Sequence, residues 1–182
     1  MKKHLLMTTA AALVLATTGL RAQEPVVGVA DPEALFHSKN PKLEKNLQAA
    51  YHIQKDLLEC GHWDQADQFL TERYIQHNPN AKSGRAGVVF YFTQVLKIKP
   101  KPCPEKMASK IVAVVAQGDR VIVVTPREYK DATDPSKSYS TTWFDMWRFV
   151  DGKADEHWDP AQRAAPAAAP PTAPKKEGDT PK

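Results

Sequence analysis

Apolar residues recur at helical spacing in the first half of the chain. Over residues 41–61 they fall at positions i, i+4, i+7 and i+8 with Lys and Glu between them, which predicts an amphipathic helix. A short second helix is expected over residues 64–73, and a third over residues 85–97 behind a Ser cap. Residues 23–40 show no such period and are expected to be irregular.

The second half of the chain has the pattern of strands. Residues 110–116 and 121–125 are rich in Val and Ile and flank a Gly-Asp turn, which predicts a hairpin. A polar loop around residues 131–138 leads to a longer hairpin over residues 139–159. Helices followed by a meander of antiparallel strands predict an α+β fold, in which the helices pack on a curved antiparallel sheet.

Both ends of the chain differ from this pattern. Lys2 and Lys3, the apolar stretch Leu5–Leu20 and the small residue Ala22 predict a signal peptide over residues 1–22. The mature protein is then expected to be periplasmic or secreted, without stable membrane insertion after cleavage. The alternative is an uncleaved N-terminal anchor.

The C-terminal end is rich in Pro and Ala. Residues 164–182 contain no large apolar side chain, so we expect an extended, disordered tail. Between the two ends, residues 41–163 are expected to form one domain with a single core. The whole chain carries +4, but the signal and the tail hold most of this excess, so the domain is near neutral and nucleic-acid binding is not expected.

Cofactor and metal motifs give no positive signal. The chain has no nucleotide-binding loop and no Ser nucleophile elbow, and its His and Asp spacing matches no recognised metal signature. We therefore expect no cofactor and no metal. Cys60 and Cys103 could form a disulfide after export, or could be two separate buried thiols; the sequence leaves both open.

The candidate chemistry lies in the last predicted hairpin. Asp145, His157 and Asp159 could meet on one face and form an acid/base pocket, because a carboxylate in an apolar cavity is a stronger base than one in water. The alternative is a set of salt bridges at the rim of the fold.

The turn of this hairpin decides between these arrangements. A two-residue turn at residues 151–152 pairs Val150 with Lys153 and separates the three side chains. A three-residue turn with a Gly bulge pairs Phe149 with Lys153 and places all three on one face. We favour the bulged turn, because it also groups apolar side chains on the opposite face.

Three motifs resemble a known family. They are the run from Tyr74 to Pro79, the Gly84-x-x-Gly87 helix start, and the closing run from Phe144 to Asp159. Together they resemble the SnoaL-like polyketide cyclases of the nuclear transport factor two-like superfamily, over roughly residues 42–162. The resemblance implies a cone-shaped α+β barrel, with helices closing one side of a curved sheet around a deep, mostly apolar cavity.

The resemblance also implies roles for individual residues. By motif position Asp159 is the residue that moves a proton from a carbon next to a carbonyl. The histidine that assists it in the cyclases is replaced by Asp145, so cyclase chemistry does not transfer directly. His77 could lie on the cavity wall beside Asn78, which could instead bond its own backbone in a turn. The expected lining residues are Trp63, Tyr74, Phe92, Trp143 and Trp147.

Two functions remain open. The first is an enzyme for acid/base chemistry of the isomerase, cyclase or aldol type on a small hydrophobic or carbonyl-containing molecule, with His77, Asp145 or His157 assisting Asp159. The second is a non-catalytic envelope module that binds a ligand or another protein. In the bulged register Phe144, Met146 and Trp158 point away from the cavity, and this apolar patch predicts a homodimer.

Overall fold

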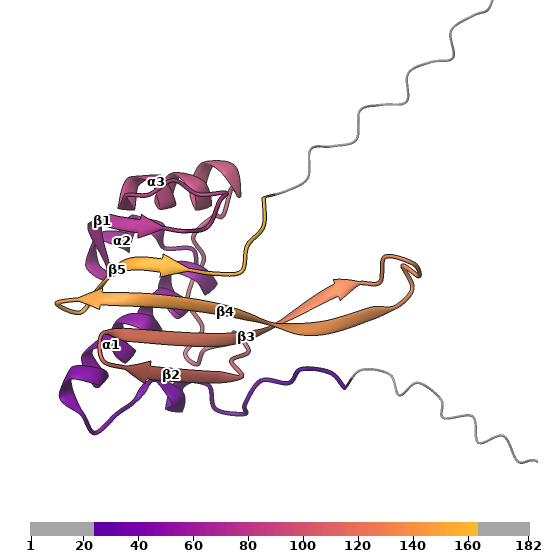
Figure 1. Ribbon diagram of the computed structural model, residues 1–182, viewed down its shortest axis with the longest axis horizontal. Coiled ribbons are helices and arrows are strands. Elements are labelled where there is room, and N and C mark those ends of the chain that lie inside the picture. Colours follow the sequence, from indigo (N-terminus) through magenta and orange to yellow (C-terminus); the bar gives the residue numbers. More distant parts are fainter. Residues whose placement is uncertain (1–23, 164–182) are drawn as a thin grey trace, which may run out of the picture.

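The computed structural model describes residues 24–163 as helices packed on a five-stranded sheet, whose arrangement is drawn in Figure 1. The α-helices are α1 (Pro41–His52), α2 (Ala66–Phe69) and α3 (Arg85–Phe90), and the strands are β1 (Leu70–Gln76), β2 (Ala113–Gln117), β3 (Arg120–Lys130), β4 (Ser138–Val150) and β5 (Lys153–Trp158). Short 3-10 turns cover Glu33–Phe36 and Trp63–Gln65, and π-helical turns extend α1 over Ile53–Glu59 and α3 over Tyr91–Val95.

The predicted signal peptide and tail lie outside the described residues, so both stay predictions. Within residues 24–163, no helix is long and apolar enough to cross a membrane.

The α+β prediction is confirmed, with a correction to the second helix. The predicted helix over residues 64–73 is wrong in its second half, since α2 ends at Phe69 and the chain is extended from Leu70 onward. Both Leu70 and Tyr74 are buried in this extended segment, so tertiary packing overrides the local helical pattern.

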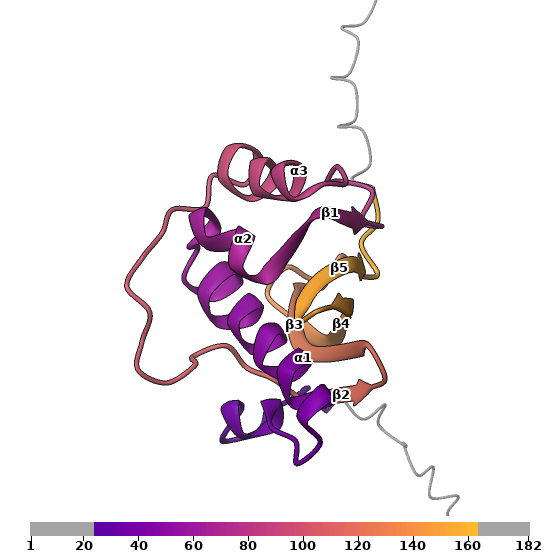
Figure 2. The same cartoon turned by 90° about the vertical axis from the view of Figure 1, so that its left-hand side faces the viewer.

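The sheet has the strand order β1-β5-β4-β3-β2 and remains open at both edges. Strands β2 to β5 are antiparallel, as expected, but β1 pairs in parallel with β5, so the sheet is mixed. Figure 2 shows the sheet curving from β1 to β2, with α1 beside its concave side and α3 beside β1. The outer half of the β3–β4 hairpin projects beyond the rest of the domain (Figure 1).

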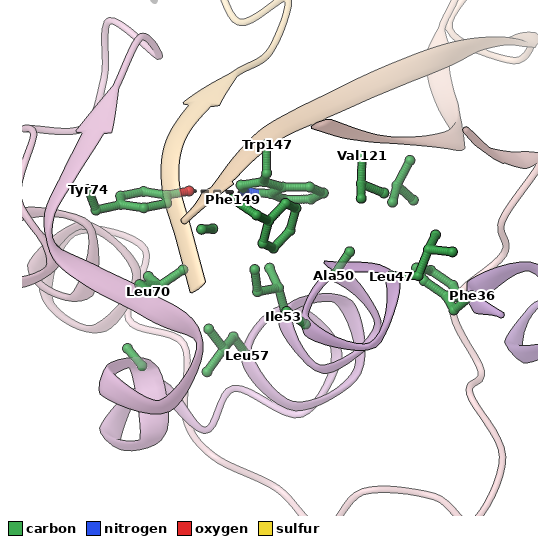
Figure 3. Packing of buried hydrophobic residues seen from close by; sticks show 14 of the residues in the cluster. Phe36, Leu47, Ala50, Ile53, Leu57, Leu70, Tyr74, Val121, Trp147 and Phe149 are labelled. Atoms are coloured by element: carbon green, nitrogen blue, oxygen red, sulfur yellow. Dashed lines mark hydrogen bonds between the residues drawn. The ribbon is translucent and has the colours of Figure 1, made fainter. Parts of the chain in front are cut away.

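The core lies between α1 and the concave face of the sheet (Figure 3). Ile53 and Leu57 from the helical side meet Trp147 and Phe149 of β4, all at most 4% exposed. Each such side chain contributes roughly 1.5–3 kcal/mol when fully buried. This packing fixes the position of β4, the strand that carries the candidate site.

A disulfide joins Cys60 and Cys103, with their Cα atoms 5.3 Å apart. It ties the end of the first helix to the Pro-rich connector and closes a sequence separation of 43 residues, which stabilises the fold by about 4 kcal/mol in a chain-entropy estimate. Gly61 follows at φ 76°, and a Cβ there would lie 2.8 Å from the Lys99 carbonyl oxygen. Only glycine therefore fits this crossing without a shift.

The β4–β5 hairpin combines a two-residue turn with a later bulge. Asp151 and Gly152 have φ values of 52° and 82°, and Val150 pairs with Lys153, so the favoured three-residue turn is wrong. Asp155 is then inserted as an extra residue, because Ala154 pairs with Phe149 while the next β5 pair skips it. This bulge restores the side-chain alternation that places the candidate residues on one face.

Asp155 is held by two arginines from neighbouring strands. Arg73 of β1 and Arg148 of β4 both contact its carboxylate, and the Thr71 hydroxyl donates to Oδ1 at 2.8 Å. The side chain is buried, and these donors, Arg73 first, lower the pKa of Asp155 to about 2. The bulge is therefore secured by a charged cluster that spans three strands.

We expect Asp155→Asn to lower the free energy of unfolding by about 2–3 kcal/mol near neutral pH, because it removes a buried acceptor from two cations. The contribution of Asp155 should be complete above its ordinary pKa near 3.8 and be lost as the pH falls toward its folded pKa of about 2. Urea unfolding of both proteins between pH 6 and pH 2 measures this loss. Asp119→Asn, which affects only an exposed pair with Arg120, is the control and should cost under about 0.5 kcal/mol. If the difference in unfolding free energy between Asp155→Asn and the unsubstituted protein stays constant over this pH range, the stabilising role of the Asp155 charge is contradicted.

Candidate functional site

A cavity of about 260 Å³ opens between the helices and the concave face of the sheet. Most of its wall is apolar and comes from the helices and β4. Its polar end is formed by Gln76 and Asn78 from the end of β1 and by Asp145, His157 and Asp159 from the last hairpin. An apolar cavity with a few convergent polar groups is typical of a small-molecule site.

All five aromatic residues expected at the cavity do line it: Trp63, Tyr74, Phe92, Trp143 and Trp147. Trp63 and Phe92 stack with their ring centroids 3.9 Å apart. The indole nitrogen of Trp63 is buried and has no hydrogen-bond partner within the described part of the chain.

The structure brings Asp145, His157 and Asp159 together. One ligand atom from each lies within 4.8 Å of the others. This follows from the bulged register, in which His157 pairs with Trp147 on the same face as Asp145, two residues earlier on β4. His157 is 6% exposed, and the two carboxylates are half-buried.

The side chain of Gln76, at the end of β1, determines that the Nδ1 atom of the His157 ring carries a proton. The side-chain oxygen of Gln76 accepts the backbone N–H of Asn78 at 3.0 Å, which identifies this atom as the carbonyl oxygen. The same oxygen lies 2.7 Å from His157 Nδ1, so Nδ1 must carry a proton and donate it. The other ring nitrogen, Nε2, faces Asp145 Oδ1 at 3.1 Å.

Asp145 and His157 must share a proton along this contact. A carboxylate oxygen and a bare ring nitrogen would both be acceptors, so the proton sits between Nε2 and Oδ1. Trp143 Nε1 also donates to Oδ1 at 3.1 Å, which favours the carboxylate form of Asp145 paired with a doubly protonated ring. Among the described residues, none donates to the second oxygen of Asp145.

Asp159 is oriented by two N–H donors. Asn78 Nδ2 donates to Oδ2 at 2.7 Å, and the backbone N–H of Ala161 donates to Oδ1 at 2.9 Å. The orientation of the Asn78 amide is fixed, since its oxygen accepts the backbone N–H of Asn80 at 2.9 Å. Asp159 is thus a positioned carboxylate at the polar end of the cavity.

Tyr74 supplies a neutral donor beside these acids. Its hydroxyl oxygen accepts from Trp147 Nε1 at 3.1 Å, as Figure 3 shows, so its own proton is free to point at a ligand. Burial raises the pKa of Tyr74, and the charges of Asp145 and Asp159 raise it further. The phenol therefore keeps its proton across the physiological pH range.

The profile of the SnoaL-like domain matches residues 53–157, more than half of the chain. The chain belongs to the SnoaL-like domain family. No curated protein matches it.

Solved structures similar to this chain include polyketide cyclase-like proteins. A SnoaL-like, polyketide cyclase-like protein of Jannaschia sp. CCS1 is 15% identical, with a TM-score of 0.49 over 68% of this chain and 91% of that one. A polyketide cyclase-like protein of Acidithiobacillus ferrooxidans is 16% identical, with a TM-score of 0.48 over 68% of this chain and 89% of that one. One of Bacillus cereus is 20% identical, with a TM-score of 0.46 over 77% of this chain and 87% of that one. Identities and TM-scores this low support no inference about the activity of this chain.

In this SnoaL-like domain His77 does not line the cavity. Its Nε2 pairs with Glu156 at 2.9 Å and its ring stacks on Trp158 at 5.1 Å, both on the outer face of the sheet. The expected cavity position is therefore wrong. Alternation along the extended β1 segment explains this, because Gln76 and Asn78 point inward and the residue between them points outward. The same alternation could have identified Gln76 from the sequence.

In the described part of the SnoaL-like domain, the ligand atoms of Asp145, His157 and Asp159 lie close enough together to hold a metal ion. Several of their ligand atoms also have protein partners. Both oxygens of Asp159 accept N–H donors, and Asp145 is paired with His157. These hydrogen bonds hold the three side chains in place.

We expect His157 to carry a proton on Nδ1 in solution. Gln76→Glu preserves the acceptor and should preserve this proton, whereas Gln76→Leu removes the acceptor and should allow Nδ1 to lose its proton while Nε2–H still faces Asp145. Long-range nitrogen-15 correlation spectra of histidine-labelled protein report this directly. Observation of an unprotonated Nδ1 in the unsubstituted protein would refute the assignment.

Proposed function

We propose that the cavity binds a small, mostly apolar carbonyl compound and that the site moves a proton at the carbon next to the carbonyl. The observation that carries this proposal is that a positioned carboxylate, Asp159, and a neutral phenol, Tyr74, line the same largely apolar cavity. These are the base and the oxygen donor that such a reaction needs.

Asp159 would act as the base. Its two N–H donors fix its direction and leave each oxygen with a further lone pair. A bound apolar ligand would displace the water that otherwise solvates the carboxylate and weakens it as a base. The motif position of Asp159 in the SnoaL-like family supports the same role.

Tyr74 would donate to the carbonyl oxygen as negative charge develops there. The N–H bond from Trp147 to the phenol oxygen polarises the O–H group and makes it a stronger donor. Because the donor is already buried and oriented, it needs no reorganisation during the reaction.

The Asp145–His157 pair would complete the proton balance. With the proton on the ring, the pair is neutral overall, so Asp159 keeps the net negative charge of the cluster. Asp159 takes a proton from carbon, and the enolate forms. In an isomerisation, the protonated Asp159 returns this proton to another carbon. In an aldol-type ring closure, the enolate carbon bonds to a second carbonyl carbon of the substrate, the C=O π electrons move onto oxygen, and the protonated Asp159 gives its proton to that alkoxide.

A bicyclic ketone tests this without knowledge of the natural substrate. We expect the protein to accelerate exchange of the acidic C–H protons of 2-tetralone for deuterium, followed by proton NMR in heavy water. Asp159→Asn should lower the catalysed rate by about two to four powers of ten, the usual contribution of a general base. Its folding cost should stay near 1 kcal/mol, since one amide donor then faces another.

The controls separate catalysis from binding. Tyr74→Phe should reduce the exchange rate while 2-tetralone still binds, and Asp119→Asn on a distant turn should change neither. If 2-tetralone binds but exchanges no faster than in buffer, the catalytic proposal fails and the domain is a ligand-binding module.

We also propose that the outer face of the sheet forms a homodimer contact. The strand register places Val115, Ile122, Met146 and Trp158 in one row across β2, β3, β4 and β5. Phe144 lies beside this row and is 48% exposed. A contiguous apolar row of this kind is unfavourable in water and fits a self-complementary interface.

Light scattering should give about twice the mass of the mature chain. Phe144→Lys should yield a monomer, because it places a charge within the contact. Phe90→Lys, at a similarly exposed apolar position on α3, should leave the dimer intact. A monomer that persists at high protein concentration would contradict the proposal.

A further inference from the structure

A second hollow, of about 520 Å³, adjoins the cavity of the acid/base cluster. The two share four wall residues, Leu58, Phe92, Arg127 and Asp145, so they adjoin at these side chains. The second hollow is more polar, and its wall includes residues of β3 together with Ser109 and Lys110. A ligand seated at the acid/base cluster therefore lies next to it.

Arg127 stands where the two hollows meet. Its guanidinium lies over the ring of Trp143, with Cζ 4.7 Å from the ring centroid. Within residues 24–163 no carboxylate pairs with it, although Asp145 and Glu128 border the same space. Asp145 is already paired with His157, and Glu128, at the wall of the second hollow, makes no ion pair with Arg127 within residues 24–163. The stacked guanidinium is thus an oriented cation available to a ligand.

Gln54 adds a polar side chain to the wall of the same space. It is 4% exposed, it lines the second hollow, and its Nε2 lacks a hydrogen-bond partner in the described part of the chain. A buried amide donor without an acceptor is unfavourable, and such groups are rare unless a ligand or water satisfies them. An oxygen of a bound ligand would satisfy this one.

We propose that the ligand is amphipathic, with an apolar body at the acid/base cluster and an anionic oxygen group in the second hollow. That group pairs with Arg127 and accepts from Gln54 Nε2. Lys110, which also borders this hollow, adds positive charge at its opening. This inference rests on the proposed function, since it names the substrate class of the same site.

A matched pair of fluorescent probes tests the inference. The probe 1-anilinonaphthalene-8-sulfonate has an aromatic body and an anionic group, and N-phenyl-1-naphthylamine has the same skeleton without the charge. We expect the protein to bind the anionic probe more tightly, with one probe per chain. Arg127→Gln should lower the affinity for the anionic probe about tenfold or more, because a charge-assisted contact is lost. The affinity for the neutral probe should stay nearly unchanged.

Three further variants make the result specific. Gln54→Met, which keeps the size of the side chain, should also weaken the anionic probe selectively. Lys130→Gln removes a positive charge from the same strand away from both hollows and should have no effect. Phe144→Ser changes the outer apolar face and should have no effect either.

The outcomes separate this inference from the proposed function. If the neutral probe and 2-tetralone both fail to bind, the ligand cavity itself is wrong. If both bind but Arg127→Gln leaves the anionic probe unchanged, or weakens both probes equally, only the anionic subsite is overturned. Loss of the anionic probe in Phe144→Ser without loss in Arg127→Gln also overturns it.

Discussion

The arrangement of the whole site depends on the single extra residue in β5. Asp155 is buried between Arg73 and Arg148, and its insertion shifts the pairing of β5 against β4 by one position. The tight turn alone would have left the carboxylate of Asp145 on the face opposite Asp159. A buried charge held by two cations on the outer face thus determines which side chains meet on the inner face.

Inside the cavity, the direction of each hydrogen bond is determined by the neighbouring one. A backbone N–H fixes the orientation of the Gln76 amide, and the amide oxygen fixes the proton on Nδ1 of His157. The other ring nitrogen then pairs with the carboxylate of Asp145. Asn78 does the same for Asp159 from the next inward position of the same segment. The polar end is therefore a connected network with few alternative arrangements, and such networks hold reactive groups more rigidly than isolated pairs.

The spacing of apolar residues predicted those helices and strands whose buried face repeats regularly along the sequence. The first and third helices, both hairpins and the inward face of Asp145 were all expected from spacing. The parallel pairing of β1 with β5 could not be, because it joins segments about 80 residues apart and depends on tertiary packing. The sequence predicts the bulge at Gly152 and not at Asp155, since the arginines that stabilise it are distant in sequence or equally compatible with surface positions. It leaves the position of His77 open, because a histidine beside Asn78 fits a cavity wall as well as a turn, whereas alternation along the extended segment directs it outward.

The disulfide has a consequence for the entrance of the cavity. Beyond Cys103 the connector is held again by Glu59, whose carboxylate accepts the backbone N–H groups of Ala108 and Ser109 at 3.1 and 2.8 Å. Ser109 and Lys110 then form one rim of the second hollow. A segment without regular structure is thereby ordered before any ligand arrives, so the conformational entropy of this rim is lost during folding and not during binding.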